Sequence, residues 1–131
     1  MSNEHLGTIL VVEDDPAIRS LVSLLLTDEG YRVISCDGAL AAIETQTPSA
    51  PDLVLLDIVL GETDGVTLAQ ELRERYGDDL KILAMSAISE IDKYAGAMGA
   101  MNEIEKPFNL DQLVLAVKEA LQAPPQQPTR A

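Results

Sequence analysis

The stretch LVLLDIVLGETDG, residues 53–65, begins with the segment that decides the fold, in which four consecutive apolar residues end at the carboxylate of Asp57. An apolar run without alternation is typical of a strand buried on both faces, as in a parallel sheet covered by helices. Asp57 would then lie at the carboxyl end of a buried strand. A charge at the edge of a core needs compensating partners, so this aspartate is a candidate functional residue.

The rest of the chain alternates between expected strands and expected helices. Strands are predicted at residues 8–12, 32–36, 53–57, 81–86 and 102–106, and helices at residues 16–29, 39–47, 66–76, 89–98 and 110–122. This alternation predicts right-handed βαβ units and a parallel sheet with helices on both faces. We therefore expect one α/β domain over residues 8–122, a flexible N-terminus over residues 1–7, and a disordered Pro- and Gln-rich tail over residues 123–131.

The ends of the first and last helices carry the clearest local signals. Asp15 is a predicted N-cap followed by Pro16 in the first turn, and Gly30 is the expected stop. Gly77 is likewise the expected stop of the helix at residues 66–76. Asn109 is the predicted N-cap of the last helix, with Gln112 placed for a capping box. The apolar stripe expected to pack that helix against the core comprises Leu110, Leu113, Val114, Val117 and Leu121.

Composition and charge exclude several classes of protein. The 131 residues suit one domain, and 9 basic against 22 acidic residues give a net charge of −13. A protein that binds nucleic acid or anionic lipid directly needs a basic face, so neither partner is expected. No apolar stretch approaches the roughly 20 residues of a membrane span, and we expect a soluble cytoplasmic protein. The single cysteine, Cys36, excludes an internal disulfide and is expected to be a small residue at the core edge.

Polar residues end four of the five predicted strands, at the sheet edge where doubly wound proteins carry their functional groups. These residues are Glu13 and Asp14, then Asp57, Ser86 and Lys106. Taken singly, they could favour helix N-termini, cap turns or lie in solvent. Together, three neighbouring carboxylates would repel one another unless cations compensate them. Lys106 supplies one cation, and Mg²⁺, which prefers oxygen ligands, is the natural second.

At this point the chain resembles a known family, the receiver domains of two-component response regulators, also called CheY-like domains. The segments that carry the resemblance are ILVVEDDP, PDLVLLDIVLGETDG, ILAMSA and EKPF, in the family's order and spacing from about Thr8 to Leu121. The resemblance implies an α/β fold, a doubly wound five-stranded parallel sheet with five helices and strand order 2-1-3-4-5.

The resemblance also implies a role for each matched residue. Asp57 corresponds to the phospho-acceptor, and Ser86 and Lys106 to the residues that contact the phosphoryl group. Glu13, Asp14, Asp57 and the backbone carbonyl of Val59 correspond to the site for Mg²⁺ or Mn²⁺, with Asp14 the more direct ligand of the acidic pair. The remaining residues assigned to the switch region are Ala87, Glu103 and Pro107. The peptide bond that precedes Pro107 is expected to be cis.

The implied function is acceptance of a phosphoryl group from a phosphohistidine on a histidine kinase or a histidine phosphotransfer protein. A carboxylate is ionised at neutral pH, so Asp57 needs no general base, and Mg²⁺ and Lys106 would reduce its repulsion of the incoming group. The protein would catalyse its own phosphorylation and dephosphorylation but have no separable enzymatic output. Phosphorylation would then change the surface that a downstream protein target recognises.

The family resemblance also indicates where partners dock. The start of the first helix, with Ile18 and Leu21, commonly docks the kinase, although part of that stripe must belong to the core. The face formed by residues 89–122 is the usual output surface and the surface through which a homodimer would form. The short tail favours a single-domain regulator, and the N-terminal Met favours a complete chain.

Three departures from the family pattern bear on the switch. Glu103 stands where the family usually has an aromatic residue that rotates inward, and burying a carboxylate there would be costly. Glu103 is also compatible with an ordinary solvated strand residue. Gly61 replaces a common proline and permits a looser loop, whereas Val59 places an apolar side chain near the path of attacking water, so we expect a changed phosphate lifetime.

Two other classes of function are compatible with part of the sequence. A phosphorylation-independent interaction module is favoured by Glu103 and Gly61, but the intact set of Asp57, Asp14, Ser86 and Lys106 opposes it. A nucleotide- or flavin-binding doubly wound domain would need a glycine-rich phosphate loop after the first strand. The sequence has acids there, which would repel phosphate.

Overall fold

The computed structural model describes residues 6–38, 50–57, 59–60, 63–86, 102–105 and 109–123, with residues 59–60, 63–64, 86 and 102–105 described by their backbone alone. The predicted helices at residues 39–47 and 89–98 lie outside the described residues, as do Ala87, Lys106 and Pro107. The backbone is hydrogen-bonded to the turn at Gly30 from Leu6 onward, because the Leu6 amide donates to the Gly30 carbonyl at 3.0 Å.

The central layer is a five-stranded parallel sheet, as predicted. Its strands are β1 (Thr8–Val12), β2 (Arg32–Cys36), β3 (Leu53–Asp57), β6 (Ile82–Ser86) and β7 (Asn102–Glu105). They are arranged in the order β2-β1-β3-β6-β7, which confirms the predicted order 2-1-3-4-5 when these strands are counted along the chain. β3 is central and all five of its residues are buried, as expected for an apolar run without alternation.

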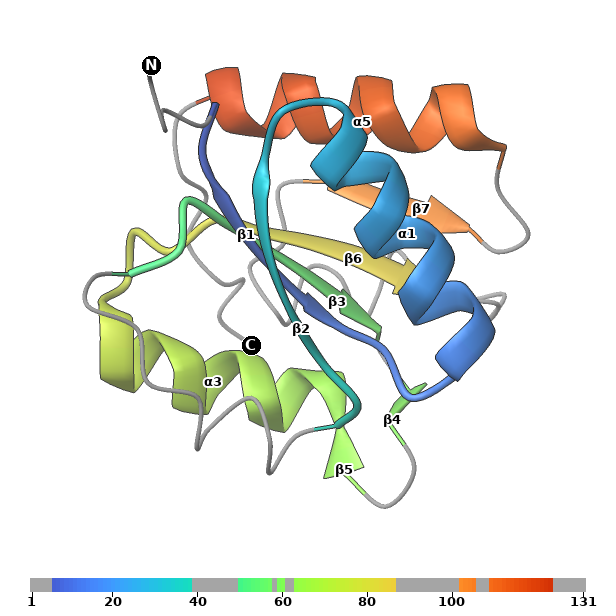
Figure 1. Cartoon of the computed structure of the whole chain (residues 1–131). Coiled ribbons are helices and arrows are strands. Elements are labelled where there is room, and N and C mark those ends of the chain that lie inside the picture. The colour runs from blue at the N-terminus through green and yellow to red at the C-terminus, as the bar shows by residue number, and fades with distance from the viewer. Residues whose placement is uncertain are drawn as a thin grey trace.

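Helices cover both faces of this sheet (Figure 1). The helices are α1 (Pro16–Asp28), α3 (Gly65–Tyr76) and α5 (Leu110–Gln122), with α1 and α5 on one face and α3 on the other. Side chains that alternate along each strand divide between two buried clusters. Ile9 and Leu55 belong to the cluster with α1 and α5, whereas Leu10 and Leu56 belong to the cluster with α3.

The two predicted helix caps are both present. The Asp15 side chain accepts hydrogen bonds from the amides of Ala17 and Ile18, at 2.9 and 3.3 Å, and starts α1. The capping box at α5 is complete, because the Asn109 side chain accepts from the Gln112 amide at 2.7 Å while the Gln112 side chain accepts from the Asn109 amide at 3.1 Å.

The predicted helix stops are also found where glycine is needed. Gly30 follows α1 with φ of 106°, and Gly77 follows α3 with φ of 107°. A side chain at either position would be strained in this left-handed region, so both glycines are required by the backbone.

The structure differs from the sequence prediction at two places. Val59–Leu60 (β4) and Thr63–Asp64 (β5) form a small antiparallel pair that was not predicted, because two-residue strands are too short to show alternation. Leu110, predicted to pack against the core, is 41% exposed. The buried face of α5 is formed instead by Leu113 and Val117 with the small residues Ala116 and Ala120, which let the helix approach the sheet closely.

Within the described part of the chain, none of the helices has both the length and the apolar character that crossing a membrane requires.

The capping box at α5 makes a first prediction. Asn109→Ala removes the acceptor for the Gln112 amide and should lower the free energy of unfolding by about 1 kcal/mol, measured by urea denaturation. Gln122→Ala, at the exposed other end of the same helix, is the matched control and should leave stability nearly unchanged. Equal stability of Asn109→Ala and the wild-type protein would contradict a stabilising cap.

Candidate acidic metal centre

The candidate site lies at the carboxyl ends of β1 and β3. Glu13 and Asp14 follow β1 directly, and Asp57 is the last residue of β3. The two strands are neighbours with Val12 paired to Leu56, so the three carboxylates reach the same edge of the sheet. The strand order reverses between β1 and β3, because β2 lies on one side of β1 and β3 on the other. Ligand sites in doubly wound proteins form at such a switch point.

The three carboxylates form a compact group. One carboxylate oxygen from each of Glu13, Asp14 and Asp57 lies within 4.8 Å of the others. Glu13 is fully buried and Asp57 is 5% exposed, whereas Asp14 is exposed to solvent. Three oxygen donors with one open side suit a hard divalent cation such as Mg²⁺, which keeps part of its water shell. The acidic pair and the strand-end aspartate predicted from sequence are therefore brought together.

The turn that carries Glu13 and Asp14 is braced by hydrogen bonds on both sides. The Glu13 amide donates to the Cys36 carbonyl at 3.1 Å, which ties the turn to the end of β2. The Glu13 Oε2 atom accepts from the Asp15 amide at 3.1 Å, so the same short segment both orients Glu13 and starts α1. These bonds limit how far the acidic side chains can move apart to relieve their repulsion.

Arg19 is a contributor that the sequence analysis missed. Its Nη1 atom donates to the Glu13 carbonyl at 3.0 Å from the second turn of α1, and the side chain is half-buried. The guanidinium group therefore brings a positive charge to the acidic turn and anchors its backbone. This contact could have been predicted from the spacing of Asp15 and Arg19, since residues four apart lie on the same side of a helix.

Of the other predicted phosphoryl-binding residues, Ser86 ends β6 at the same edge of the sheet as Asp57. Asp57 is paired with Met85 in β6, so Ser86 lies one residue beyond that pair along β6. Ser86 is in turn paired with Glu105 at the end of β7, and Lys106 is the next residue along the chain, outside the described part. Val59 starts β4, two residues after Asp57. The roles of Ser86, Lys106 and Val59 stay predictions.

The predicted switch residues are described only in part. Glu103 lies in the edge strand β7, paired with Ala84 of β6. Ala87 and Pro107 lie outside the described residues, so their predicted roles stay untested.

Comparison with known proteins supports the same assignment of family. Residues 9–118 match the sequence profile described as the response regulator receiver domain. The chain is 32% identical over 123 residues to sporulation initiation phosphotransferase F of Bacillus subtilis, covering 92% of this chain and 96% of that protein. It spans only 27% to 49% of other matched regulators, such as transcriptional regulatory protein ZraR of Klebsiella oxytoca and regulatory protein VanR of Enterococcus faecium.

Solved structures agree with the fold. The receiver domain of NtrX from Brucella abortus superposes with a TM-score of 0.79 at 36% identity, covering 88% of this chain and 98% of that one. Response regulator TrrA from Thermotoga maritima, in complex with Mg²⁺ and BeF, superposes with a TM-score of 0.75 at 33% identity, covering 88% of this chain and 99% of that one.

Repulsion within the acidic group makes a second prediction. Without divalent cations, Asp57→Asn should raise the free energy of unfolding by on the order of 1 kcal/mol, because it removes one of three neighbouring negative charges. With saturating Mg²⁺ this gain should shrink or reverse, because wild type binds the cation better. Urea denaturation with EDTA and with Mg²⁺ measures both values. Asp28→Asn, an exposed acid on α1 outside the group, is the control. The same difference in both conditions would contradict a metal site.

The bond between Arg19 and the Glu13 carbonyl makes a third prediction. Arg19→Ala should lower the free energy of unfolding by about 1–2 kcal/mol, since it removes a charge-assisted hydrogen bond and leaves the carbonyl without that donor. Thermal or urea denaturation in EDTA measures the loss. Arg32→Ala, at an exposed arginine of β2, should cost less than half as much. Similar losses for the two variants would mean that Arg19 does not brace the turn.

Proposed function

Since this chain belongs to the receiver-domain family of two-component response regulators, we propose that its Asp57 accepts a phosphoryl group from a phosphohistidine donor. The single observation that carries the proposal is the group formed by Asp57, Glu13 and Asp14, with carboxylate oxygens within 4.8 Å of one another at the sheet's switch point. An acceptor aspartate beside two further acids matches a reaction that needs both a carboxylate nucleophile and a divalent cation.

The reaction has two steps, transfer to Asp57 and later hydrolysis. An oxygen of the Asp57 carboxylate attacks phosphorus, the bond from phosphorus to the donor histidine nitrogen breaks, and that nitrogen retains the electron pair. Water later attacks the aspartyl phosphate, which releases inorganic phosphate and restores the carboxylate. The low exposure of Asp57, 5%, limits access to an in-line approach from the open side of the site.

Mg²⁺ or Mn²⁺ would be held by the carboxylates of Glu13, Asp14 and Asp57 and by the backbone carbonyl of Val59. The bound cation would neutralise charge shared between the acids and the incoming phosphoryl group. The similarity to TrrA, whose structure is described as a complex with Mg²⁺ and BeF, supports this assignment. Glu13, which also accepts a bond from the Asp15 amide, would orient the site more than it binds the cation directly.

Ser86 and Lys106 would contact the phosphoryl oxygens from the two strands beyond β3. Ser86 would donate its hydroxyl and Lys106 its ammonium group, and the movement of Ser86 toward the phosphoryl group would start the switch. With Glu103 in the edge strand instead of an aromatic residue, we propose that the switch uses the segment from Ser86 through Ala87 and the Lys106–Pro107 segment, without an inward ring rotation.

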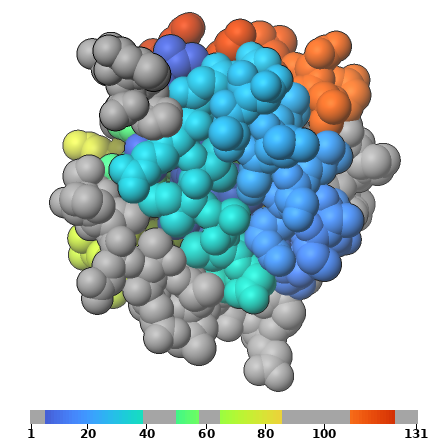
Figure 2. All heavy atoms as spheres, in the orientation of Figure 1, coloured from blue at the N-terminus to red at the C-terminus, as the bar shows by residue number. Residues whose placement is uncertain are grey.

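The phosphoryl donor would be a histidine kinase or a histidine phosphotransfer protein, docked beside the acidic group on α1. The helix exposes Leu21 by 48% and Leu24 by 70%, whereas Ile18 is half-buried, so Leu21 is the better docking candidate of the two predicted residues. In Figure 2, α1 lies across the face turned to the viewer with α5 along its upper border. A hollow of about 360 Å³ between Leu21, Leu24 and Leu110 would receive apolar side chains of the donor.

The output of the switch would be a changed protein surface and no separate enzymatic activity. The face over residues 89–122 is proposed to contact the downstream protein and to support a homodimer. The similarity to sporulation initiation phosphotransferase F, matched over 96% of its length, supports a role as a phosphorelay intermediate. A phosphorylation-independent interaction module is the second candidate, favoured by Glu103 at the position of the family's switch aromatic.

Phosphorylation makes a fourth prediction. Incubation of wild type with acetyl phosphate and Mg²⁺ should add one phosphoryl group, detected as intact mass, because the small donor reaches the acidic site without a kinase. Omitting Mg²⁺ should reduce the adduct at least tenfold, and Asp57→Asn should abolish it. Asp79→Asn, an acid at the other end of the sheet, is the matched control and should be phosphorylated like wild type.

Two outcomes would contradict the proposal in different ways. An adduct that persists in Asp57→Asn would assign the acceptor to another residue. Absence of an adduct, together with absence of beryllofluoride binding in the presence of Mg²⁺, would favour the phosphorylation-independent module.

A further inference from the structure

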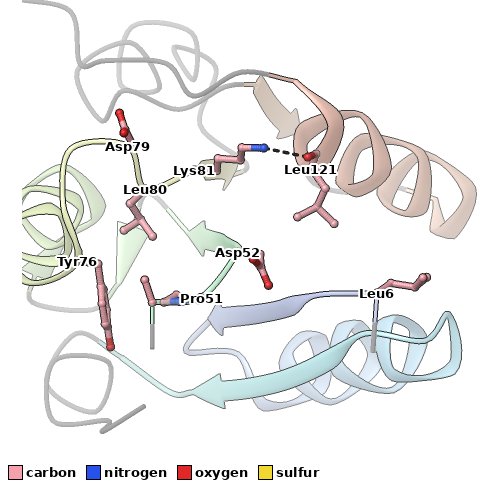
Figure 3. Close-up of a pocket in the computed structure, with 9 residues that line it drawn as sticks. Leu6, Pro51, Asp52, Tyr76, Asp79, Leu80, Lys81 and Leu121 are labelled. Atoms are coloured by element: carbon pink, nitrogen blue, oxygen red, sulfur yellow. Dashed lines mark hydrogen bonds between the residues drawn. The ribbon is translucent and has the colours of Figure 1, made fainter. Parts of the chain in front are cut away.

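A second pocket lies at the amino edge of the sheet, at the opposite end of β3 and β6 from the acidic group (Figure 3). It has a volume of about 390 Å³ and is formed where β3 and β6 begin and where α3 and α5 end. The lining residues that matter here are Asp52, Tyr76, Asp79, Leu80, Lys81 and Leu121. This pocket takes no part in the proposed phosphoryl chemistry.

The pocket combines an aromatic and apolar wall with acidic groups. The apolar wall is supplied by the largely buried Leu80 and by Tyr76, whose ring centroid lies 5.3 Å from the Arg75 guanidinium carbon. Asp52 and Asp79 are exposed acids at its border, and the Asp52 carboxylate also accepts a hydrogen bond from the Thr8 amide at 2.7 Å. The one lysine in the lining, Lys81, donates its ammonium group to the Leu121 carbonyl at 2.8 Å, as the dashed line in Figure 3 shows. That bond holds the lysine at the end of α5. The chemistry of the pocket therefore suits a ligand with apolar rings and a positive charge.

The chain itself leaves α5 at the wall of this pocket. Leu121 lines the pocket, and Ala123, two residues later, has φ of −81° and ψ of 156°. These angles are those of a polyproline II helix, which is also the conformation that a residue before proline prefers. Pro124 follows Ala123 directly. The described backbone thus enters the C-terminal segment in polyproline II geometry beside the pocket.

The sequence beyond Ala123 has the composition that the pocket suits. Residues 124–131 are PPQQPTRA, with three prolines, one arginine and no acidic side chain. Within them, Pro125 and Pro128 form a PxxP motif followed two residues later by Arg130. Segments of this kind favour polyproline II and dock on aromatic surfaces, while arginine pairs with carboxylates.

We propose that residues 124–131 dock in this pocket of the same molecule, with prolines against Tyr76 and Leu80 and Arg130 against Asp52 or Asp79. Eight residues in polyproline II geometry reach up to about 25 Å, so the segment is long enough to cross a pocket of this volume. Attachment to α5 supplies an effective concentration on the order of millimolar, so a weak contact is enough to hold the segment. The net charge of the whole chain, −13, further favours docking of the one basic side chain of the segment.

The test compares full-length variants by NMR of the backbone amides. Arg130→Glu and the double variant Pro125→Ala/Pro128→Ala should each shift the amides of Asp52, Asp79 and Leu80, in the direction seen for a chain that ends at Ala123. Position 130 is seven residues beyond Ala123, so local sequence effects do not reach the pocket. Gln126→Ala/Gln127→Ala is the matched control, since the glutamines are not part of the PxxP and arginine pattern, and it should leave these amides unshifted.

Three outcomes would overturn the proposal. Unshifted pocket amides in all variants, including the chain that ends at Ala123, would mean that the segment does not dock. Equal shifts in the Gln126→Ala/Gln127→Ala control would mean that the shifts do not depend on the prolines. Shifts that disappear on dilution would place the segment in the pocket of a second molecule. Phosphorylation of Asp57 is a separate readout, so failure of this proposal and failure of the proposed function are distinguishable.

Discussion

Mutual repulsion among Glu13, Asp14 and Asp57 is the constraint on which the rest of the structure depends. Two of the three carboxylates are buried, and their oxygens lie within 4.8 Å of one another and of Asp14. Without a supporting framework such like charges would move apart. The fold prevents separation because Asp57 ends the fully buried strand β3, and Glu13 is tied to Cys36 and Asp15 by hydrogen bonds. A divalent cation bound among these carboxylates would relieve that repulsion.

The same constraint explains why the site is made of residues from several elements. A single strand can offer only every second side chain to one face, so three carboxylates at one point require two neighbouring strands and the turn between β1 and α1. The parallel pairing of β3 with β1 brings these elements together. The positive charge of Arg19 on the Glu13 carbonyl and the helix start at Asp15 then offset part of the cost.

The sequence was sufficient for the parts of this arrangement that depend on local pattern. The apolar run before Asp57, the caps at Asp15 and Asn109 and the glycines that end α1 and α3 each have a local physical cause, and the structure confirms them. The meeting of the acids was predicted because parallel strands end at a common edge. The parts that escaped prediction depend on three-dimensional packing. Exposure of Leu110 depends on how α5 lies on the sheet, and the contact of Arg19 depends on the turn that precedes it.

The position of the acidic group also limits how a charge change at Asp57 can be transmitted. Phosphorylation would add between about one and two negative charges, and a nearly complete switch would need about 5.5 kcal/mol of differential stabilisation. The central strands are poor candidates for movement, because the residues of β3 preceding Asp57 and most of β1 are fully buried between two packed clusters. Any movement would therefore involve residues outside these two strands. β3 would then serve as a fixed support for a charge change at Asp57, because its residues are held between the two buried clusters.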